Sequence, residues 1–465
     1  SSLVTRLTGD VTNIQNSIST GMRPACRAPV MMITAIAVSF YINKELAVIF
    51  LIAAPVLGIL LFLIISHVRP LYARMQKAVD LVNRIIQENL TAIRVVKSYV
   101  RGDYELSKFE EVNAGLQTTS ERAFRVASLN MPAMQFVMYT TILCILWFGG
   151  NLILAGGMKV GELTGFLSYV LQVLNSLMMI SNVFMMFTRS LTSWKRITEV
   201  MDEKIDITED DARDITVEKG DIEFDHVYFK YSSQAKEYVL SDISLKMEAG
   251  QTIGIIGRTG AAKTTLVQLI PRLYDVTEGQ IRIDGYPVQE YPLKPLRDAI
   301  AMVLQKNTLF SGTVRDNLRW GKEDATEEEI EEACRIACVD EFIGRLENGY
   351  DTDLGQGGVN VSGGQKQRLC IARALLKKPK VLILDDSTSV VDTATEAKIR
   401  EGMAKSLPGT TKIIIAQRIS SVAHADKIVI LEDGKIHATG THEELLKNNL
   451  IYQEIYQSQQ EGADL

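Results

Sequence analysis

The stretch that decides the fold is Val361-Ser-Gly-Gly-Gln-Lys-Gln-Arg368, followed by the run Val381-Leu-Ile-Leu-Asp385-Asp386. The two glycines after Ser362 let backbone N–H groups approach an anion, and a helix that starts there favours negative charge at its N-terminus. The apolar run reads as a buried strand that ends in two acids. The sequence therefore predicts an anion-binding helix start, with a pair of acids at a nearby strand end.

A second glycine-containing segment, Gly257-Arg-Thr-Gly-Ala-Ala-Lys-Thr264, lies upstream. It follows the apolar strand 251–257 and precedes the helical run 264–273, which is the context that a phosphate loop requires. Backbone N–H groups and the helix N-terminus in such a loop face the phosphates. Lys263 is expected to reach the outer phosphates, and the Thr264 hydroxyl is expected to ligate Mg²⁺.

The order of these segments resembles the nucleotide-binding domain of an ATP-binding-cassette (ABC) transporter, and the resemblance covers essentially the whole chain. It implies ATP and Mg²⁺ as cofactors. Tyr231 matches the aromatic residue that stacks on adenine, although a strand aromatic in the core is the alternative. The implied nucleotide-binding residues are Tyr231, Gly257, Arg258, Thr259, Gly260, Ala261, Ala262, Lys263, Thr264 and Thr265, and the implied metal-binding residues are Thr264, Gln305 and Asp385.

The resemblance also implies a partner subunit. Residues Ser362, Gly363, Gly364 and Gln365 match the family signature, which meets the γ-phosphate of ATP bound to the other subunit. Ser389-Val-Val-Asp392 resembles the D-loop at the dimer interface. Each ATP is then expected to lie between the phosphate loop of one chain and the signature of the other.

Two hydrolytic positions depart from the family. Asp386 stands where the family has a glutamate that polarises the attacking water, so its carboxylate is retracted by one methylene, about 1.5 Å. A misplacement of about 1 Å can cost about a hundredfold in rate. Gln417 stands at the switch histidine and can donate a hydrogen bond to a γ-phosphate, but it cannot be cationic. We expect Asp386, Gln417 and Gln305, in the Gln-loop position, to be the catalytic residues.

A third departure lies in the phosphate loop, where Ala262 replaces the expected glycine. Its methyl group strains the loop if φ is positive, whereas a right-handed helical conformation leaves the N–H available. We expect ATP binding that is present but weakened.

Four segments are long and apolar enough to cross a hydrocarbon core of about 30 Å, which needs about 20 residues; they are 24–43, 46–66, 131–155 and 163–187. The segment 67–130 between the second and third is polar and helical, with a break near 100–103. The positive-inside rule places that segment in the cytoplasm, because basic residues gather at its ends: Arg69, Arg74, Lys77, Arg84, Arg122 and Arg125. Its stretch 91–99 resembles the coupling region of ABC exporters, and a helix that only packs on its neighbours is the alternative.

The fourth span carries polar side chains such as Gln172, Asn175 and Ser176. These side chains fit a helix that lines a cavity, and they fit helix–helix hydrogen bonding equally well. Related half-transporters have six spans, so the resemblance leads us to expect that the chain begins just before the third.

The fold class predicted is multi-domain: an all-α transmembrane bundle of exporter type plus an α/β P-loop NTPase domain with an ABC helical subdomain. We expect a transmembrane domain at 1–201, a linker at 202–218 and the nucleotide-binding domain at 219–465. The net charge of −6 gives no basic footprint for a nucleic-acid partner. The five cysteines are scattered and do not form a metal-binding pattern.

The losses of the glutamate and the histidine, with the signature intact, resemble the degenerate half of heterodimeric bacterial ABC multidrug exporters. The sequence therefore predicts a multi-pass cell-membrane protein that exports drugs or other amphipathic small molecules and contacts membrane lipid. Its partner is expected to be a different half-transporter with both residues intact. The alternatives are a homodimeric exporter of lipid or peptide, in which Asp386 works slowly, and an ATP-gated channel or nucleotide sensor.

Overall fold

The computed structural model describes residues 3–386 and 391–461. The chain divides into two compact units, Ser1–Lys204 and Ile205–Leu465, which we call the helical unit and the α/β unit. The elements of the helical unit are α1 (Leu3–Thr5), the π-helical turn η1 (Arg6–Asp10), α2 (Val11–Ser19), α3 (Met22–Ile42), α4 (Lys44–Thr91), α5 (Ile93–Ser98), α6 (Gly102–Ser128), α7 (Asn130–Leu154) and α8 (Val160–Met201).

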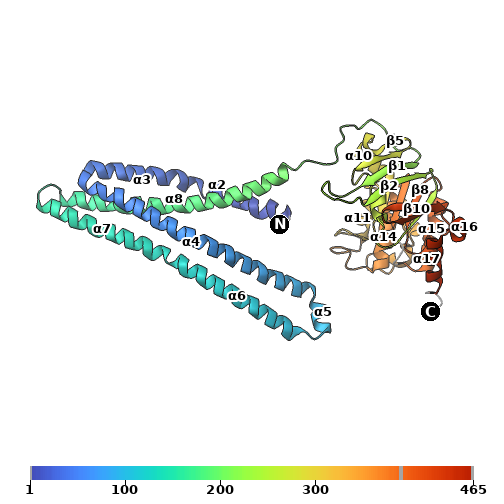
Figure 1. Cartoon of the computed structure of the whole chain (residues 1–465), viewed down its shortest axis with the longest axis horizontal. Coiled ribbons are helices and arrows are strands. Elements are labelled where there is room, and N and C mark those ends of the chain that lie inside the picture. Colours follow the sequence, from blue (N-terminus) through green and yellow to red (C-terminus); the bar gives the residue numbers. More distant parts are fainter. Residues whose placement is uncertain (1–2, 387–390, 462–465) are drawn as a thin grey trace. The chain divides into compact units, whose positions relative to one another are not determined.

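The long helices of the helical unit lie side by side. Helix α3 packs along α8, and α4 packs along α6 and α7 (Figure 1). The core between them is built from small and apolar side chains, with Ala35, Leu46, Ile145 and Phe166 all fully or almost fully buried. Close packing of such residues lets the helix axes approach each other.

The turn between α3 and α4 is tight because Asn43 caps the next helix. Its side-chain oxygen accepts hydrogen bonds from the backbone N–H groups of Glu45 (2.9 Å) and Leu46 (3.1 Å). These N–H groups belong to the first turn of α4 and have no partner within the helix. The cap thus allows two apolar helices to be joined by a single extended residue.

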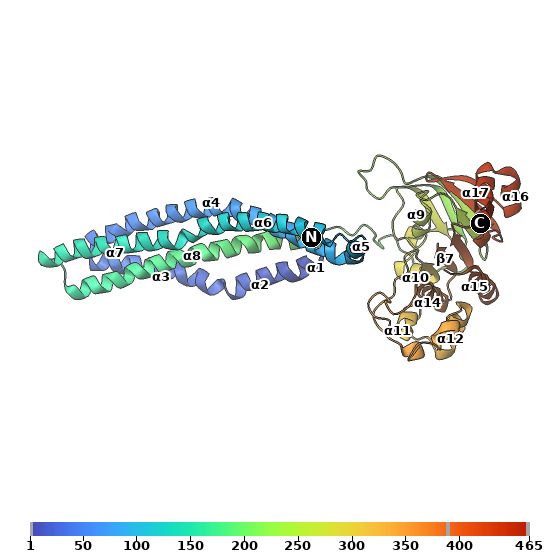
Figure 2. The ribbon, with the colours of Figure 1, turned by 90° about the horizontal axis from the view of Figure 1, so that it is seen from below.

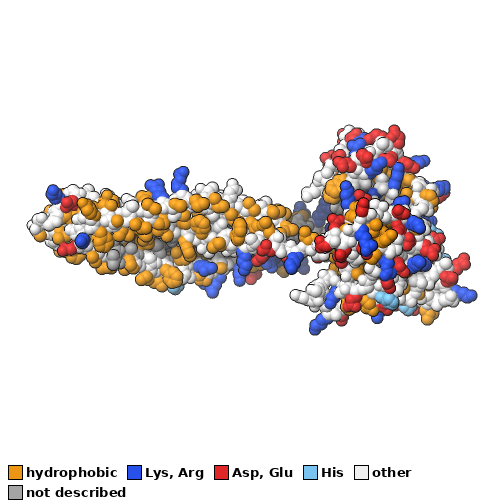
Figure 3. All heavy atoms as spheres, turned by 90° about the horizontal axis from the view of Figure 1, so that it is seen from above, with side chains coloured by type: hydrophobic (Ala, Val, Ile, Leu, Met, Phe, Trp, Pro, Cys, Tyr) orange, Lys and Arg blue, Asp and Glu red, His pale blue; other side chains and the backbone are white. Residues whose placement is uncertain are grey.

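In the described part of the chain, four helical segments are long and apolar enough to cross a membrane: Leu3–Ile42, Pro55–Thr91, Gly102–Leu154 and Val160–Met201. The expected spans overlap α3, α4, α7 and α8. Large apolar side chains face outward along the unit, including Tyr41, which is 92% exposed. Figure 3 shows hydrophobic side chains spread over this surface, whereas charged side chains cover much of the α/β unit.

The polar side chains of the fourth span divide between two environments. Gln172 donates from Nε2 to the backbone carbonyl of Met31 on α3 at 3.3 Å, and the buried Ser176 donates to the Gln172 carbonyl at 2.8 Å. Gln172 therefore joins α8 to α3, whereas Ser176 satisfies its hydroxyl within α8. Asn175 and Asn182 are exposed on the surface of the helical unit.

The polar segment between the second and third expected spans is a helical hairpin with a short extra helix. The chain leaves α4 at Ala92, forms α5, and reverses through Val100, which has a positive φ of 53°. The reversal coincides with the break expected near 100–103, and α6 then runs back along α4 (Figure 2). Asn89 on α4 donates to the Glu105 carboxylate on α6 at 3.0 Å, which ties the two arms together.

The α/β unit contains two sheets. A four-stranded antiparallel sheet has the order β2-β1-β4-β5, and a six-stranded sheet has the order β10-β9-β3-β8-β7-β6. In the second sheet all neighbours pair in parallel except β10. The strands are β1 (Ile222–Phe229), β2 (Leu240–Met247), β3 (Thr252–Ile256), β4 (Glu278–Ile283), β5 (Tyr286–Pro287), β6 (Ile300–Val303), β7 (Val381–Asp385), β8 (Thr411–Ile415), β9 (Lys427–Glu432) and β10 (Lys435–Gly440).

Helices α11 and α12 pack on α14 and form a helical subdomain with it, and α14 also packs on β6 of the sheet (Figure 2). The central strands β7 and β8 are buried along their whole length, as expected for a parallel sheet covered on both faces. The helices are α9 (Lys263–Gln268), η2 (Val288–Glu290), α10 (Leu293–Ala299), α11 (Val314–Arg319), α12 (Glu327–Ile336), α13 (Asp340–Ile343), η3 (Gly349–Asp351), α14 (Gly363–Leu376), α15 (Thr393–Ser406), η4 (Ile419–Ser421), α16 (His442–Asn448) and α17 (Leu450–Glu461).

Replacing Asn43 by alanine should destabilise the helical unit, because two N–H groups at the start of α4 lose their acceptor. Loss of such a cap typically costs about 1 kcal/mol. Thermal unfolding of the purified protein in detergent should show a lower midpoint for Asn43→Ala. Asn151→Ala, at an exposed position on α7, is the control, and an equal effect of both changes would contradict the capping role.

Candidate functional site

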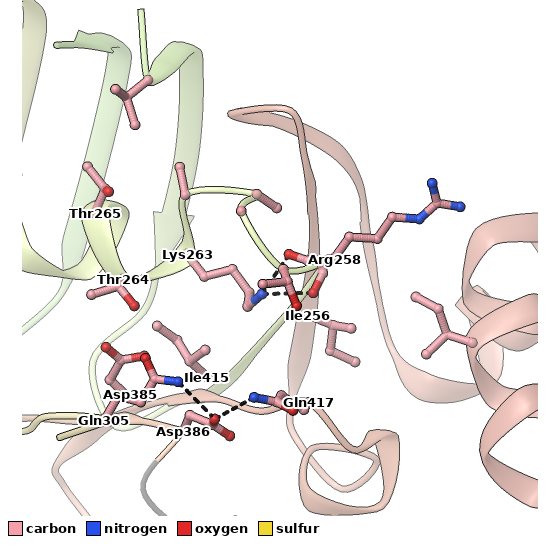
Figure 4. Close-up of a pocket in the computed structure, with 17 residues that line it drawn as sticks. Ile256, Arg258, Lys263, Thr264, Thr265, Gln305, Asp385, Asp386, Ile415 and Gln417 are labelled. Carbon is pink, nitrogen blue, oxygen red and sulfur yellow. Dashed lines mark hydrogen bonds between the residues drawn. The ribbon is translucent and has the colours of Figure 1, made fainter. Parts of the chain in front are cut away.

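The carboxyl ends of β3, β7 and β8 meet at one edge of the six-stranded sheet, because these strands are parallel neighbours. A cavity of about 500 Å³ lies at this edge and is lined by the loop residues 257–265 and by Gln305, Asp385, Asp386 and Gln417. Figure 4 shows these side chains converging from separate elements. The fold thus brings together the expected catalytic, metal-binding and phosphate-loop residues, which are far apart in the sequence.

The phosphate loop runs from the end of β3 to the start of α9 through two left-handed residues. Gly260 has φ 88°, and Ala262, the residue before α9, has φ 68° and ψ 24°. Glycine adopts this region freely, whereas for alanine it costs roughly 1–2 kcal/mol. Ala262 therefore takes the strained conformation and not the right-handed one.

The loop lysine points back over the loop. Its Nζ donates to the carbonyls of Gly257 (2.8 Å) and Arg258 (2.9 Å). Burial lowers the pKa of Lys263, and attraction to Asp386 and Asp385 opposes that shift. The Arg258 backbone lines the cavity, but its side chain points away from the two acids (Figure 4). An anion that enters the cavity can replace these two carbonyls as the hydrogen-bond acceptor of the Lys263 ammonium group.

Asp385 ends β7 and is only 2% exposed. Burial raises the pKa of its carboxyl, and a hydrogen bond from the Thr264 side chain opposes that shift. Its Oδ2 atom is buried and has no hydrogen-bond partner among the described residues. An unpartnered buried carboxylate oxygen is costly, so a hydroxyl and a free oxygen at this place fit a hard cation such as Mg²⁺.

The protein alone supplies few ligands for such a cation. Among the described residues, no cluster of three or more His, Cys, Asp or Glu side chains could hold a metal. Mg²⁺ commonly uses one or two protein ligands together with substrate phosphates and water. The donor set of Thr264 and Asp385 matches that pattern.

Asp386 accepts hydrogen bonds from two glutamines on one oxygen. Its Oδ2 lies 2.6 Å from Nε2 of Gln417 and 3.4 Å from Nε2 of Gln305, which approach from two sides (Figure 4). Asp386 is 8% exposed and has φ 48°, a left-handed conformation. Burial raises the pKa of its carboxyl, while the two amide donors and Lys263 oppose the shift.

Tyr231 lies beside the phosphate-loop helix and not in the core. Its ring is 54% exposed, and its hydroxyl is 2.9 Å from the Thr265 hydroxyl. Edge contacts with Phe229 and Tyr274 hold the ring, with centroid separations of 4.9 and 5.2 Å. The exposed side of the ring is available for stacking.

The signature residues lie at the start of α14, in the helical subdomain. Ser362 caps this helix reciprocally with Gln365: the Ser362 N–H donates to Gln365 Oε1 at 2.8 Å, and the Gln365 N–H donates to Ser362 Oγ at 3.4 Å. Ser362 and Gly363 are exposed. Among the described residues that line the cavity, none comes from the signature. Residues 387–390 lie outside the described part of the chain, so the expected D-loop is described only from Val391 onward.

Three residues near the site did not stand out in the sequence. Val239 and Ile455 line the cavity, and Gln459 on α17 bonds to the backbone of the segment that carries Gln417. Val239 directly precedes β2, and Ile455 and Gln459 lie in the C-terminal helix α17. The sequence offers no local motif for them, because their role depends on the path of α17 through the fold.

Replacing Ala262 by glycine should stabilise the α/β unit in the absence of nucleotide. The change removes left-handed strain of roughly 1–2 kcal/mol, less the roughly 0.5–1 kcal/mol of added chain entropy. The midpoint of thermal unfolding should therefore rise slightly for Ala262→Gly. The same change at Ala394, an exposed position in α15, should lower the midpoint, and equal signs for the two variants would contradict the strain.

Replacing Asp386 by asparagine should raise the unfolding temperature at neutral pH. Because the folded-state pKa of Asp386 is raised by burial, the folded protein binds more protons than the unfolded chain between the two pKa values. Its stability therefore falls as pH rises through that range. The increase in unfolding temperature of Asp386→Asn over the unmodified protein should be largest at neutral pH and should shrink on acidification. The control is Asp324→Asn at an exposed position. An increase that does not depend on pH would contradict the buried charge.

Comparison with known proteins supports the same interpretation of both units. The family described as ABC transporter transmembrane region matches residues 1–177, and the family described as ABC transporter matches residues 240–389. The chain is 42% identical over 466 residues to the ABC transporter ATP-binding protein YfiB of Bacillus subtilis, covering all of this chain and 81% of that protein. These matches confirm the predicted fold class and the ATP-hydrolysing class of enzyme.

Two further relatives are 35% identical over 458 residues: the ATP-dependent lipid A-core flippase of Desulfotalea psychrophila and a putative multidrug export ATP-binding/permease protein of Staphylococcus aureus. Each alignment covers 98% of this chain and 80% or 79% of the relative. The solved structure of a bacterial Atm1-family ABC exporter with ATP bound matches with a TM-score of 0.85 and 26% identity, covering 99% of this chain and 82% of that one. This chain therefore belongs to the ABC transporter family, as an exporter-type half-transporter that joins a multi-pass membrane region to a cytoplasmic ATP-hydrolysing domain.

Proposed function

We propose that this chain is one subunit of a heterodimeric ABC exporter and that its own ATP site binds nucleotide but hydrolyses it slowly. ATP binding draws the two nucleotide-binding domains together, and hydrolysis at the site built on the partner's phosphate loop resets them. The signature of this chain, residues 362–365, completes that partner site.

The observation that carries this proposal is the pairing of Asp386 with Gln417 and Gln305 on the single oxygen Oδ2. A general base must present a free lone pair within hydrogen-bond reach of the attacking water. Here two amide donors occupy one of the two carboxylate oxygens, and the side chain is one methylene shorter than glutamate. Gln417 donates one of its two amide N–H groups to Asp386, and its side chain has no positive charge to stabilise the charge that develops on a γ-phosphate.

Nucleotide binding draws on the residues that remain intact. Lys263 and the N–H groups of the loop would hold the phosphates, and the exposed ring of Tyr231 would stack on the base. Thr264, Asp385 and Gln305 would hold Mg²⁺, which when bound neutralises charge on the transferring phosphate. The buried, unpartnered Oδ2 of Asp385 supports this assignment.

The completion of the partner's site draws on Ser362, which is exposed at the helix N-terminus. A serine hydroxyl, two glycine N–H groups and the positive end of a 14-residue helix suit an incoming phosphate. The partner proposed here keeps glutamate and histidine at the positions equivalent to 386 and 417.

Amphipathic compounds, drugs among them, are the proposed substrates. The support is the likeness to the Staphylococcus aureus protein, whose name describes putative multidrug export. A homodimeric lipid exporter is the second candidate. It is favoured by the carboxylate that Asp386 keeps inside the cavity and by the likeness to the lipid A-core flippase.

The degenerate site can be tested on this chain, purified without its partner, in lipid nanodiscs that hold two copies, so that the signature of one copy completes the site of the other. ATP turnover should be low, and the double variant Asp386→Glu, Gln417→His should raise it by about a hundredfold, because the carboxylate recovers about 1.5 Å of reach. A fluorescent ATP analogue should bind to both forms, which separates binding from hydrolysis. The matched control is Asp324→Glu, Gln457→His, two exposed positions of the same unit.

Robust turnover by the unmodified chain, on the order of 1 per second or more, would overturn the proposal in favour of the homodimeric exporter. Failure of the double variant to gain activity over the control pair would also count against a site limited by residues 386 and 417.

A further inference from the structure

Helix α17 contacts the segment that carries Gln417, and the side chain of Gln459 makes two hydrogen bonds to the backbone of that segment. Gln459 donates from Nε2 to the backbone carbonyl of Gln417 at 2.8 Å, and its Oε1 accepts from the backbone N–H of Ile419 at 2.8 Å. A carboxamide has one acceptor and one amino group on the same end. The two backbone groups it meets are two residues apart, so Gln459 bridges the segment like an additional strand partner.

The helix that carries Gln459 is itself anchored. Tyr452 is fully buried, and its hydroxyl lies 2.7 Å from Nδ1 of His442 on α16. Gln453 donates to the Leu446 carbonyl at 2.7 Å, and Ile455 packs against the core while it lines the cavity. Residues 452 and 459 are seven apart, about two helical turns, so they lie on the same face of α17.

The other contacts of residues 416–419 show why the two bonds from Gln459, which we call the clamp, affect the position of the Gln417 side chain. The N–H of Ala416 donates to the Ile255 carbonyl at 3.2 Å, which fixes the segment at the end of β8. Beyond that point the Gln417 side chain must turn toward Asp386 to reach it at 2.6 Å. The backbone bonds from Gln459 lie directly after the Cα of residue 417, at the carbonyl of Gln417 and the N–H of Ile419.

We propose that Gln459 is a positioning residue, through which α17 fixes the segment 417–419 so that the side chain at position 417 reaches the ATP site. Both bonds are to backbone atoms, so the clamp acts on whichever side chain occupies position 417. Movement of α17 then moves the group at position 417 relative to Asp386 and to the bound phosphate. The inference rests on the proposed function only in assigning ATP to this cavity.

The direct test is hydrogen exchange on the purified full-length protein. Gln459→Leu removes the acceptor of the Ile419 N–H, so the peptide that covers residues 417–422 should exchange about tenfold faster, consistent with the loss of a hydrogen bond. Gln457→Leu makes the same change at an exposed position of the same helix and should leave that peptide unchanged. Equal exchange in the two variants would overturn the clamp.

The functional test uses the background Asp386→Glu, Gln417→His, in which turnover at this chain's site is measurable. Added Gln459→Leu should lower kcat by about tenfold, since a shift of about 1 Å in a catalytic group is costly, while KM for ATP stays within about twofold because the phosphate loop is untouched. Gln459→Glu keeps the acceptor for the Ile419 N–H but loses the donor to the backbone carbonyl of residue 417, so its kcat should lie between those of the background and of Gln459→Leu.

The outcomes separate this inference from the proposed function. A background variant without turnover counts against the degenerate site, and the exchange experiment then still decides the clamp. A lower unfolding temperature for Gln459→Leu with unchanged kcat, or a parallel change in kcat and KM, indicates a merely structural side chain and overturns the positioning role.

Discussion

The parallel pairing of β3, β8 and β7 is the constraint on which the site depends. Ile255 lies opposite Ile415, and Ile415 lies opposite Asp385, so the ends of all three strands are level. The Asp386 N–H then donates to the Ile415 carbonyl at 3.0 Å, which extends the pairing one residue past the sheet. A shift of one residue in the pairing of any of these strands would turn its side chains to the other face of the sheet. The phosphate loop, the two acids and Gln417 would then no longer line one cavity.

Two of the described non-glycine residues with left-handed backbone lie at this edge. Ala262 and Asp386 both have positive φ, at 68° and 48°, and non-glycine residues in such regions persist only where the surroundings over-determine them. Ala262 begins the helix whose Leu266 and Val267 are fully buried, and Asp386 follows the most buried strand of the sheet. Packing that is far stronger than the strain therefore sets both backbone conformations, and the buried charge of Asp386 adds to the energetic cost.

The family resemblance implies a glutamate and a histidine at positions 386 and 417, and the residues present hold the site together differently. A glutamate and a histidine would each direct a side chain toward water and phosphate. Asp386 and Gln417 bond to each other instead, at 2.6 Å, and Gln305 adds a second donor at 3.4 Å. These hydrogen bonds join Asp386 to two other elements of the cavity lining, and Gln459 on α17 bonds to the backbone of residues 417 and 419.

By itself the sequence determined the fold class, the apolar helices, the phosphate loop, the signature and the two hydrolytic substitutions. Each of these features depends on residues that are close together in the sequence, as an apolar run or a short motif. Only the tertiary structure decided the sign of φ at Ala262, the position of Tyr231 beside Thr265, the bond between Gln417 and Asp386, and the clamp by Gln459. The physical reason is that these contacts join residues 31 to 42 positions apart, or follow from packing around a loop, so strand register and helix path fix them.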